Sequence, residues 1–431
     1  MGWFDKIIGR KDSVAAGFAA MSKLGKPVWS SRNYEAFAHE AYSRNVIAYS
    51  AIRMIAQNAA AIPLLAYDDR KNEIIDHPFL KVLKRPNPWQ GYEDFIDELI
   101  SFWRISGNGY IEGVALGSDI KELHALRPDR MKAIAGRRGY PSAWRYTVEG
   151  KYFDFDMELH GTKQQPILHV KDFSPIDDWY GMSPIEAGSY AIDVHNAASG
   201  FNKALLDNSA SPSGAFQVEG EAGANSLTKD QFDRLKSQMT ENYAGAKNAG
   251  RMMLLEGGLK WVPMGMTLKD LQYTDGKNQV AREIALAFGV PPMLLGIAGD
   301  NTFSNYREAN RAFHRQTVIP LLCRLLGSIS NWVQPTYPGL NLKPDVDQID
   351  ALADEREAAW KRVGSADFLT PDEKREALGY SAYQPTAKPG GRIMVNGGLM
   401  PIEDALDNTD FSGGPEPVEA EKDNDADSAA T

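Results

Sequence analysis

Two long helical segments, separated by chain of a different character, dominate the middle of this sequence. Ser183 begins the first, because Ser-Pro-Ile-Glu places a capping hydroxyl, a proline at the first helical position and a reciprocal glutamate three residues on. We expect this helix to run to about Leu206. A second helix is expected from Asp275 to Phe288, where a glycine and two prolines end it. The fold must therefore accommodate a pair of long helices joined by an insert.

The insert, residues 213–264, mixes strand and helix patterns. An apolar stretch over 215–218 comes first, and a helix is expected over 228–243. Two further strands are expected over 252–255 and 259–262. The insert therefore resembles a small α+β module.

Outside this centre, helical and alternating patterns follow one another, which favours an α+β fold. Helices are expected over 45–61 and 92–105, followed by a β-rich layer over 110–170 that contains a hairpin of 144–148 and 153–157. A further helix is expected to begin near Asn305, with Glu308 in its capping pair, and to continue through Trp332 with a kink at Pro320. Two short helices are expected over 354–363 and from Thr370 to Gly379.

Composition excludes several classes of protein. Of 431 residues, 43% are hydrophobic, so the chain is not wholly disordered. It contains one cysteine, Cys323, so it cannot form an internal disulfide. We expect Cys323 to be buried as a small hydrophobe, and synthesis to occur in a reducing cytoplasm. No apolar run reaches 18 residues and the start lacks the apolar core of a signal peptide, so neither a membrane span nor export is expected.

The net charge of −10 is unevenly spread. Residues 403–431 contain ten acidic residues and one basic residue, so nine of the ten net negative charges lie there. The remaining body is nearly neutral. Because non-specific affinity for nucleic acids comes mainly from Lys and Arg that neutralise phosphates, we expect any contact with DNA to be weak or local.

Motifs for chemistry are absent or poor. The sequence has no phosphate-binding loop, and its seven histidines show no close ligand spacing, so we expect no catalytic residue, no cofactor and no metal site. The nearest acid and histidine grouping is His169, Asp177 and Asp178, which supports a metal-dependent hydrolase or nuclease only as a remote alternative. Paired acids in a turn more often form the turn itself.

The sequence resembles the portal proteins of tailed bacteriophages, the head-to-tail connectors of the long-tailed type. The likeness covers about residues 30–380 and is carried, in the family's order, by Asn45 to Ile52, His77-Pro78-Phe79 with Pro86-Asn87-Pro88, Gly107 to Tyr110, Trp179 to Ile185, Phe288 to Pro292 with Leu294-Leu295-Gly296, and Ser304-Asn305 leading to Phe313 and Pro320.

This resemblance implies a portal fold with wing, stem, clip and crown regions, assembled as a ring around a central channel. The implied regions are an N-terminal arm (1–30), a mixed α/β wing (31–182), stem helix 1 (183–208), the clip (209–265), stem helix 2 (266–290), a tunnel loop with the kinked wing helix (291–346), the crown (347–380) and an acidic disordered tail (381–431).

The resemblance also assigns residues to these regions. The tunnel loop would contain Gly299, Asp300, Asn301, Thr302 and Phe303, which include no Lys or Arg. The stem would use Ser183, Pro184, Glu186, Ala191, Ala198, Val280 and Ile284. The clip, which would dock the packaging motor, would use Phe216, Phe232 and Trp261.

By the same resemblance, the protein would be a structural homododecamer at one capsid vertex of a virion assembled in the host cytoplasm. Double-stranded DNA would pass through it transiently and non-specifically during packaging and ejection. Its partners would be the major capsid protein and scaffold, the terminase large subunit with its ATPase, and a head-tail adaptor. Another phage head structural protein is the main alternative, and the particle type, whether phage, prophage or gene-transfer particle, stays open.

Overall fold

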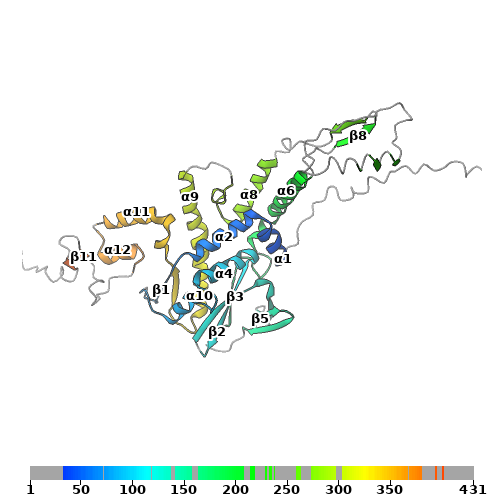
Figure 1. The fold of residues 1–431 in the computed structure, drawn as a ribbon. Helices are drawn as coiled ribbons and strands as arrows, with labels where there is room; N and C mark the ends of the chain where they lie inside the picture. The colour runs from blue at the N-terminus through cyan, green and yellow to red at the C-terminus, as the bar shows by residue number, and fades with distance from the viewer. Residues whose placement is uncertain are drawn as a thin grey trace, which may run out of the picture. The chain divides into compact units, whose positions relative to one another are not determined.

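The computed structural model describes residues 33–70, 72–117, 119–136, 141–157, 164–207, 214–218, 259–263, 273–297, 303–366 and 368–380, together with short pieces at 229–230, 233–234, 237, 394–395 and 400–401 (Figure 1). The chain divides into two compact units, residues 1–356 and 357–431. Each is described by itself below.

The core of the first unit forms around three helices, α2 (Val46–Ala60), α4 (Tyr92–Ser106) and α10 (Ile319–Val333). Their apolar faces meet in one cluster that includes Ile52, Leu99 and Leu326, each with no exposed surface. Gly107 ends α4 in the left-handed conformation (φ 76°), which a glycine adopts without steric cost. The expected helices over 45–61 and 92–105 are confirmed.

Short helical segments connect these elements. They are α1 (Tyr34–Ala36), the π-helix η3 (Phe37–Ser43), α3 (Pro78–Lys84), and the 3₁₀ helices η4 (Pro128–Arg130), η6 (Pro292–Leu295), η8 (Val346–Gln348) and η9 (Asp350–Leu352).

Three small antiparallel sheets complete the first unit's body. One has the order β3-β2-β7 and another β4-β5-β6, while β1 pairs with β10. The β5–β6 hairpin turns at Glu149 and Gly150, both with positive φ (49° and 79°), as a tight two-residue hairpin requires. The expected β-rich layer is confirmed, with these bounds: β1 Leu64–Tyr67, β2 Asn108–Leu116, β3 Asp119–Leu126, β4 Met131–Ala135, β5 Pro141–Val148, β6 Lys151–Asp156, β7 Ile167–Lys171 and β10 Asn341–Pro344.

The long helix expected from Ser183 is divided in two, α5 (Pro184–Ala187) and α6 (Ser189–Asp207). Ser183 is the N-cap, but its hydroxyl accepts from Ile185 N (3.0 Å), while Glu186 N donates to the Ser183 carbonyl. The break at Gly188 was not expected. The second helix, α8 (Tyr273–Phe288), agrees with its prediction and packs beside α6 (Figure 1).

Within the insert, β8 (Gly214–Val218) and β9 (Leu259–Pro263) form an antiparallel pair. These strands confirm two of the three expected there. The expected strand over 252–255 lies outside the described residues, as does most of the helix expected over 228–243.

The kinked helix is interrupted where the sequence predicts a distortion. α9 (Phe303–Phe313) passes into a π-helix, η7 (His314–Val318), before α10, and Pro320 lies in the first turn of α10. Proline has no N–H for the preceding helical ladder, which is consistent with the widened turn. The expected start near Asn305 is confirmed to within two residues, since α9 begins at Phe303. The expected capping pair was wrong, because Asn305 lies inside the helix and Glu308 pairs with Arg311.

Cys323 on α10 is exposed, so its predicted burial was wrong. The apolar run around it suggested burial on all sides, but α10 is amphipathic and Leu322, Leu325 and Leu326 occupy its buried face. Among the described residues, no helix is long and apolar enough to cross a membrane.

The second unit begins within α11 (Ala353–Gly364), at Glu357. α12 (Pro371–Ala377) follows, and Thr370 and Glu373 form the reciprocal capping box that the sequence predicts. Two short paired strands, β11 (Met394–Val395) and β12 (Met400–Pro401), lie in the region expected to be a disordered tail. The rest of that tail, like the arm 1–30, lies outside the described residues.

Candidate functional site

The α6–α8 helix pair is the element from which the inserted module extends, and its base is closely packed. A Cβ on Gly188 would lie 3.3 Å from Ala287 Cβ, so glycine allows the two helices to approach. Of the predicted stem residues, Ile284 is fully buried in the main core, and Ala191 and Val280 pack against it. All three therefore contribute to the same core. Pro184, Glu186 and Ala198 are partly buried.

A buried polar network ties α6 to the start of α2. Asn45 is 1% exposed, and its Oδ1 accepts from the N–H groups of Ile47 and Ala48 (both 3.1 Å). Its Nδ2 donates to His195 Nδ1 (3.1 Å) and Asn196 Oδ1 (3.0 Å) on α6. Burial, followed by the charge of Lys277, lowers the pKa of His195. Neutral His195 can accept the hydrogen bond from Asn45 Nδ2 at Nδ1, so this network fixes where the helix pair leaves the body.

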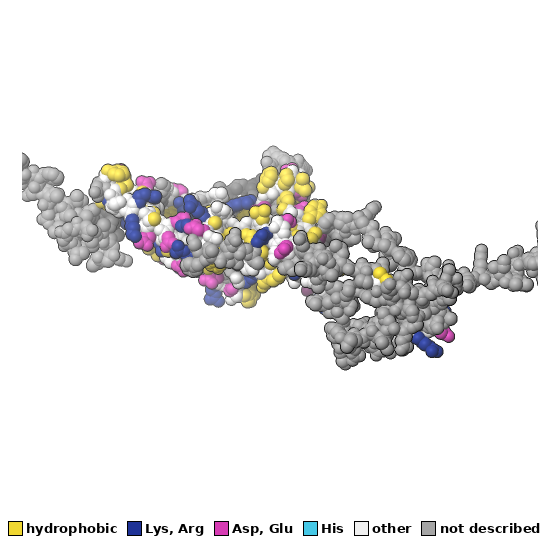
Figure 2. Space-filling model, turned by 90° about the horizontal axis from the view of Figure 1, so that it is seen from above, with side chains coloured by type: hydrophobic (Ala, Val, Ile, Leu, Met, Phe, Trp, Pro, Cys, Tyr) yellow, Lys and Arg dark blue, Asp and Glu magenta, His cyan; other side chains and the backbone are white. Residues whose placement is uncertain are grey.

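Each helix of the pair exposes large apolar side chains. Val194 on α6 is 44% exposed, and Leu286 on α8 is 78% exposed. Tyr190 and Phe201, on the same side of α6 as Val194, are 52% and 51% exposed. The space-filling view shows exposed hydrophobic side chains in several places on one face of the described surface, with Lys and Arg interspersed with Asp and Glu between them (Figure 2).

The segment that leads into α5 is clamped to α4 and α10. Asp172 accepts from Arg104 (2.5 Å) and Arg324 (3.1 Å), and the Arg104 side chain is 13% exposed. Burial lowers the pKa of Arg104, and the carboxylate of Asp172 opposes that effect. A Cβ on Gly181 would lie 2.7 Å from Asp172 N, so only glycine fits this crossing. The clamp holds the start of the helix pair against the core.

A second buried cluster lies beside the clamp. His169 stacks on Tyr110 with 4.5 Å between ring centroids, and Trp144 contacts both rings edge-on. Asn108 Oδ1 accepts from His169 Nε2 (3.0 Å) and from Gly181 N (2.7 Å). Burial, followed by the charge of Lys171, lowers the pKa of His169 to about 3. A histidine held neutral in this way has a structural role and links the sheet to the segment before α5.

The hydrolase alternative fails at these residues. Asp177 Oδ1 accepts from Trp179 N (2.7 Å) and Tyr180 N (2.9 Å), which is the turn-forming role, and the carbonyl of Asp178 accepts from Lys171. His169 instead bonds to Asn108. In the described parts of the chain, no group of three or more His, Cys, Asp or Glu side chains could hold a metal ion.

Arginines follow one another along α9 and η7, each close to a carboxylate. Arg307 lies 3.7 Å from Asp354, and Glu355 lies 3.5 Å from Arg311 and 3.4 Å from Arg315. This balance of charge argues against a tightly DNA-binding surface on this helix.

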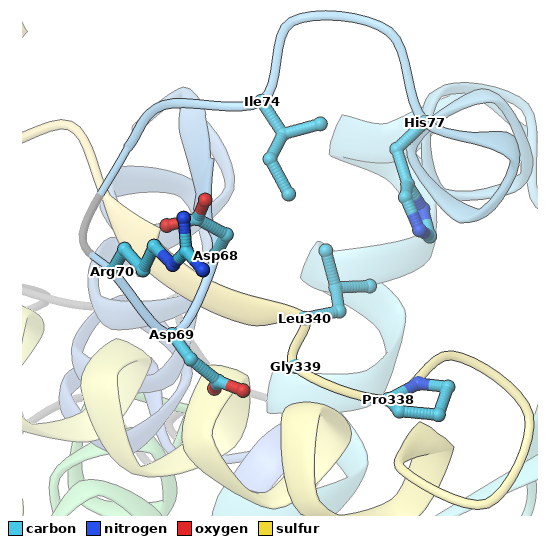
Figure 3. A pocket seen from close by; sticks show the side chains of 8 residues that line it. All are labelled: Asp68, Asp69, Arg70, Ile74, His77, Pro338, Gly339 and Leu340. Carbon is cyan, nitrogen blue, oxygen red and sulfur yellow. The ribbon is translucent and has the colours of Figure 1, made fainter.

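An open pocket of about 300 Å³ lies at the end of the β1–β10 pair (Figure 3). Its carboxylates bond to the chain itself, because Asp68 accepts from Asn72 and Asp69 from Asn341. We assign it no ligand. Its lining residues are Asp68, Asp69, Arg70, Ile74, His77, Pro338, Gly339 and Leu340.

The remaining predicted site residues are only partly placed. Phe216 and Trp261 are directly opposite each other in the β8–β9 ladder, while Phe232 lies outside the described residues. Gly299, Asp300, Asn301 and Thr302 also lie outside them, and Phe303 is the first residue of α9.

Sequence reasoning missed the Asn45–His195 network, the Asp172 clamp and the apolar stripe of α6. The spacing of Tyr190, Val194 and Phe201 on one helix face could have indicated the stripe. No local pattern could have paired Asp172 with arginines 68 and 152 residues away.

Comparisons with known proteins agree with this architecture. The model of the phage portal protein family matches residues 47–379. A Rickettsia bellii protein described as uncharacterized is 40% identical over 345 residues, covering 79% of this chain and 88% of its own length. The portal protein of Enterobacteria phage HK97 is 24% identical over 371 residues, covering 82% of each chain.

Solved structures show the same relationship. A chain from the neck of an empty GTA particle computed with C6 symmetry is 46% identical, with a TM-score of 0.66, covering 83% of this chain and 96% of that one. A chain from the neck of a native GTA particle computed with C12 symmetry is 45% identical, with a TM-score of 0.63, covering 85% and 98%. An HK97 family portal protein from Corynebacterium diphtheriae, 13% identical with a TM-score of 0.52 over 75% and 99% of the two chains, shares the fold. The chain therefore belongs to the phage portal protein family, whose members are structural proteins rather than enzymes.

Proposed function

We propose that this protein forms a dodecameric ring at one vertex of a capsid and is the conduit through which double-stranded DNA is packaged and later leaves. The observation that carries the proposal is the 45% identity, over 85% of the chain, to a component of a GTA neck computed with C12 symmetry. That likeness also favours a gene transfer agent as the particle in which the ring resides.

The charge distribution supports a conduit. A channel must let DNA slide, and multiple phosphate contacts would instead hold the duplex. The body outside residues 403–431 is almost neutral, and the arginines of α9 and η7 are balanced by carboxylates. DNA contact in this proposal is transient and independent of sequence.

The remaining partners follow from the proposed position. The vertex contacts the major capsid protein and scaffold during assembly in the host cytoplasm. The inserted module, with its β8–β9 pair, is the proposed clip that docks first the terminase large subunit and then a head-tail adaptor. Residues 297–304 are the proposed tunnel loop.

Two measurements test this function. Purified full-length protein should give ring-shaped particles with a central channel by electron microscopy, and a mass twelve times that of the 47.6 kDa chain. Host cells that lack the gene should release particles without nuclease-protected DNA, and restoring the gene should restore that DNA. Normal DNA content without the gene would contradict the conduit role.

A further inference from the structure

The turn between α3 and α4 presents a tryptophan to solvent. Trp89 is 80% exposed, although hydrogen bonds fix the turn around it. Asn87, which is 4% exposed, accepts from the backbone N–H groups of Trp89 and Gln90 (both 3.0 Å). It also donates to the Leu123 carbonyl on β3 (3.2 Å), and Gln90 donates to Glu98 on α4 (2.6 Å). An exposed aromatic side chain on a rigid turn loses little freedom on binding, which is typical of an interface anchor.

Trp89 borders a group of acidic and apolar side chains on β2 and β3. In the antiparallel register Glu112 lies opposite His124, and Val114 lies opposite Glu122, so these four side chains share one face of the sheet. The His124 ring is 6.0 Å from the Trp89 ring, and its Nε2 is 3.0 Å from Glu122. Val114 is 41% exposed, and the Glu122 side chain is 40% exposed. We call these five residues the β2–β3 patch.

The charges of the β2–β3 patch favour a basic partner. The patch contains two carboxylates, and His124 is the only one of its five side chains that can become positively charged. Burial raises the pKa of Glu112, and the charge of His124 lowers it. A cation beside Glu112 would offset the desolvation of this carboxylate, and a Lys or Arg side chain can also lie over an exposed indole. The patch is therefore suited to a segment that mixes basic and apolar residues.

The segment of this chain that precedes α1 has that composition. Residues 1–32 include six basic and two acidic residues, a net charge of +4, although the whole protein has a net charge of −10. Toward the end of this segment, Lys23 and Lys26 stand among apolar residues that include Leu24 and Val28. Its charge is therefore complementary to that of the patch.

The point where this segment joins the fold lies close to the patch. Tyr34 begins α1, which contacts η4, and η4 follows directly after β3. Glu122 is four positions before the end of β3 at Leu126, which corresponds to about 14 Å along the strand. Lys26 is eight residues before Tyr34, and eight extended residues span up to about 26 Å. The segment is therefore long enough for Lys26 to reach Glu122.

We propose that residues 23–32 bind to the β2–β3 patch of their own chain. One lysine of the segment pairs with Glu122, and the apolar side chains of the segment cover Trp89. The occupant is the chain's own segment because its charge complements the patch and its attachment point lies within reach. The inference does not depend on the proposed function, so the failure of either leaves the other standing.

Zero-length crosslinking of the full-length protein tests the contact directly. A carbodiimide joins a lysine ammonium group to a carboxylate that it touches. We expect mass spectrometry to find Glu122 joined to Lys23 or Lys26 in the gel band of the single 47.6 kDa chain. The same crosslink found only in bands of two or more chains would overturn the inference and assign the patch to a neighbouring copy. Absence of the crosslink from every band would also overturn it.

Substitutions in the patch give a second readout. Trypsin cuts after Lys23 only when the segment is released, so Trp89→Ala should raise the rate of this cut about tenfold, as the loss of an aromatic anchor predicts. Glu122→Gln should raise it as well and should abolish the crosslink to this position. Both side chains are exposed, so both variants should fold, which circular dichroism checks.

A matched control is available on another sheet. Tyr152 on β6 is 61% exposed, and Tyr152→Ala should leave the rate of cutting after Lys23 at the wild-type value. Equal rates in the wild type, Trp89→Ala and Glu122→Gln would overturn the inference. A rise of the same size in Tyr152→Ala would overturn it too, because the effect would then not be specific to the patch.

Discussion

Helices α4 and α6 have similar lengths and amphipathic patterns, yet the described chain covers their apolar side chains to different extents. The apolar face of α4 is enclosed by the chain itself, with Phe95, Leu99 and Trp103 fully buried. On α6 the inward face is buried, but Val194 on the outward face keeps 44% of its surface. Among the described residues, the apolar face of α4 is therefore enclosed by the chain itself, whereas the outward face of α6 keeps apolar side chains at the surface.

Breaking the clamp should have the largest effect on the body. Asp172→Ala leaves the mostly buried Arg104 without its carboxylate, which should lower the free energy of unfolding by about 3–5 kcal/mol. Urea denaturation measures the change. Asp154→Ala is the control, because its ion pair with Arg145 lies at the surface, and it should change stability little. Equal losses in the two variants would contradict the importance of the clamp.

Two glycine-to-alanine substitutions, one in each region, should change the free energy of unfolding in opposite directions. Gly181→Ala places a methyl group 2.7 Å from Asp172 N and should cost about 1–3 kcal/mol in the free energy of unfolding. Gly200→Ala on α6 meets open space within a helix and should stabilise the protein by about 0.5–1 kcal/mol. Thermal unfolding of both variants gives the comparison. Destabilisation by Gly200→Ala would show that α6 is more closely packed than described.

Acidic pH should lower the free energy of unfolding because His169 is held neutral in the folded chain. Its pKa in the folded state is about 3, against an ordinary value of 6.5, so below pH 6.5 the unfolded chain takes up a proton that the folded chain does not. The contribution of neutral His169 to the free energy of unfolding is fully present above pH 6.5. It falls by about 1.4 kcal/mol for each pH unit down to about pH 3. His169→Gln should flatten the profile relative to wild type. Identical pH profiles would contradict the burial of a neutral imidazole.

Removing residues 385–431 should have the smallest effect. The family match ends at residue 379, and none of the clamps or helix surfaces described above includes the removed segment. The truncated chain should form rings with the wild-type fraction by mass photometry. A truncated chain that stays monomeric while the full chain assembles would assign this tail a role in assembly.

Local signals in the sequence predicted much of the fold. Ser183 and Thr370 each cap a helix as their side chains predicted, and the pattern around Glu149 and Gly150 predicted the hairpin. These features depend on neighbours in the chain. The break at Gly188 was missed because glycine is also tolerated inside helices, and the proximity of Ala287 on α8 is seen only in the folded chain.

The candidate site was less predictable because its parts are distant in sequence. Asn45 and His195 are separated by 150 positions, and Asp172 and Arg324 by 152, so only the folded chain shows these pairs. The portal resemblance correctly indicated the family, since its motifs were spread over most of the chain. Residues of the proposed tunnel loop and most of the clip stay predictions.

The central claim is the proposed function, a ring of twelve copies that conducts DNA. The most direct test is the mass of the purified full-length protein, measured by mass photometry, with electron microscopy of the same sample. We predict particles of twelve chains with a central channel. A protein that stays monomeric both alone and with its capsid partners would contradict this claim.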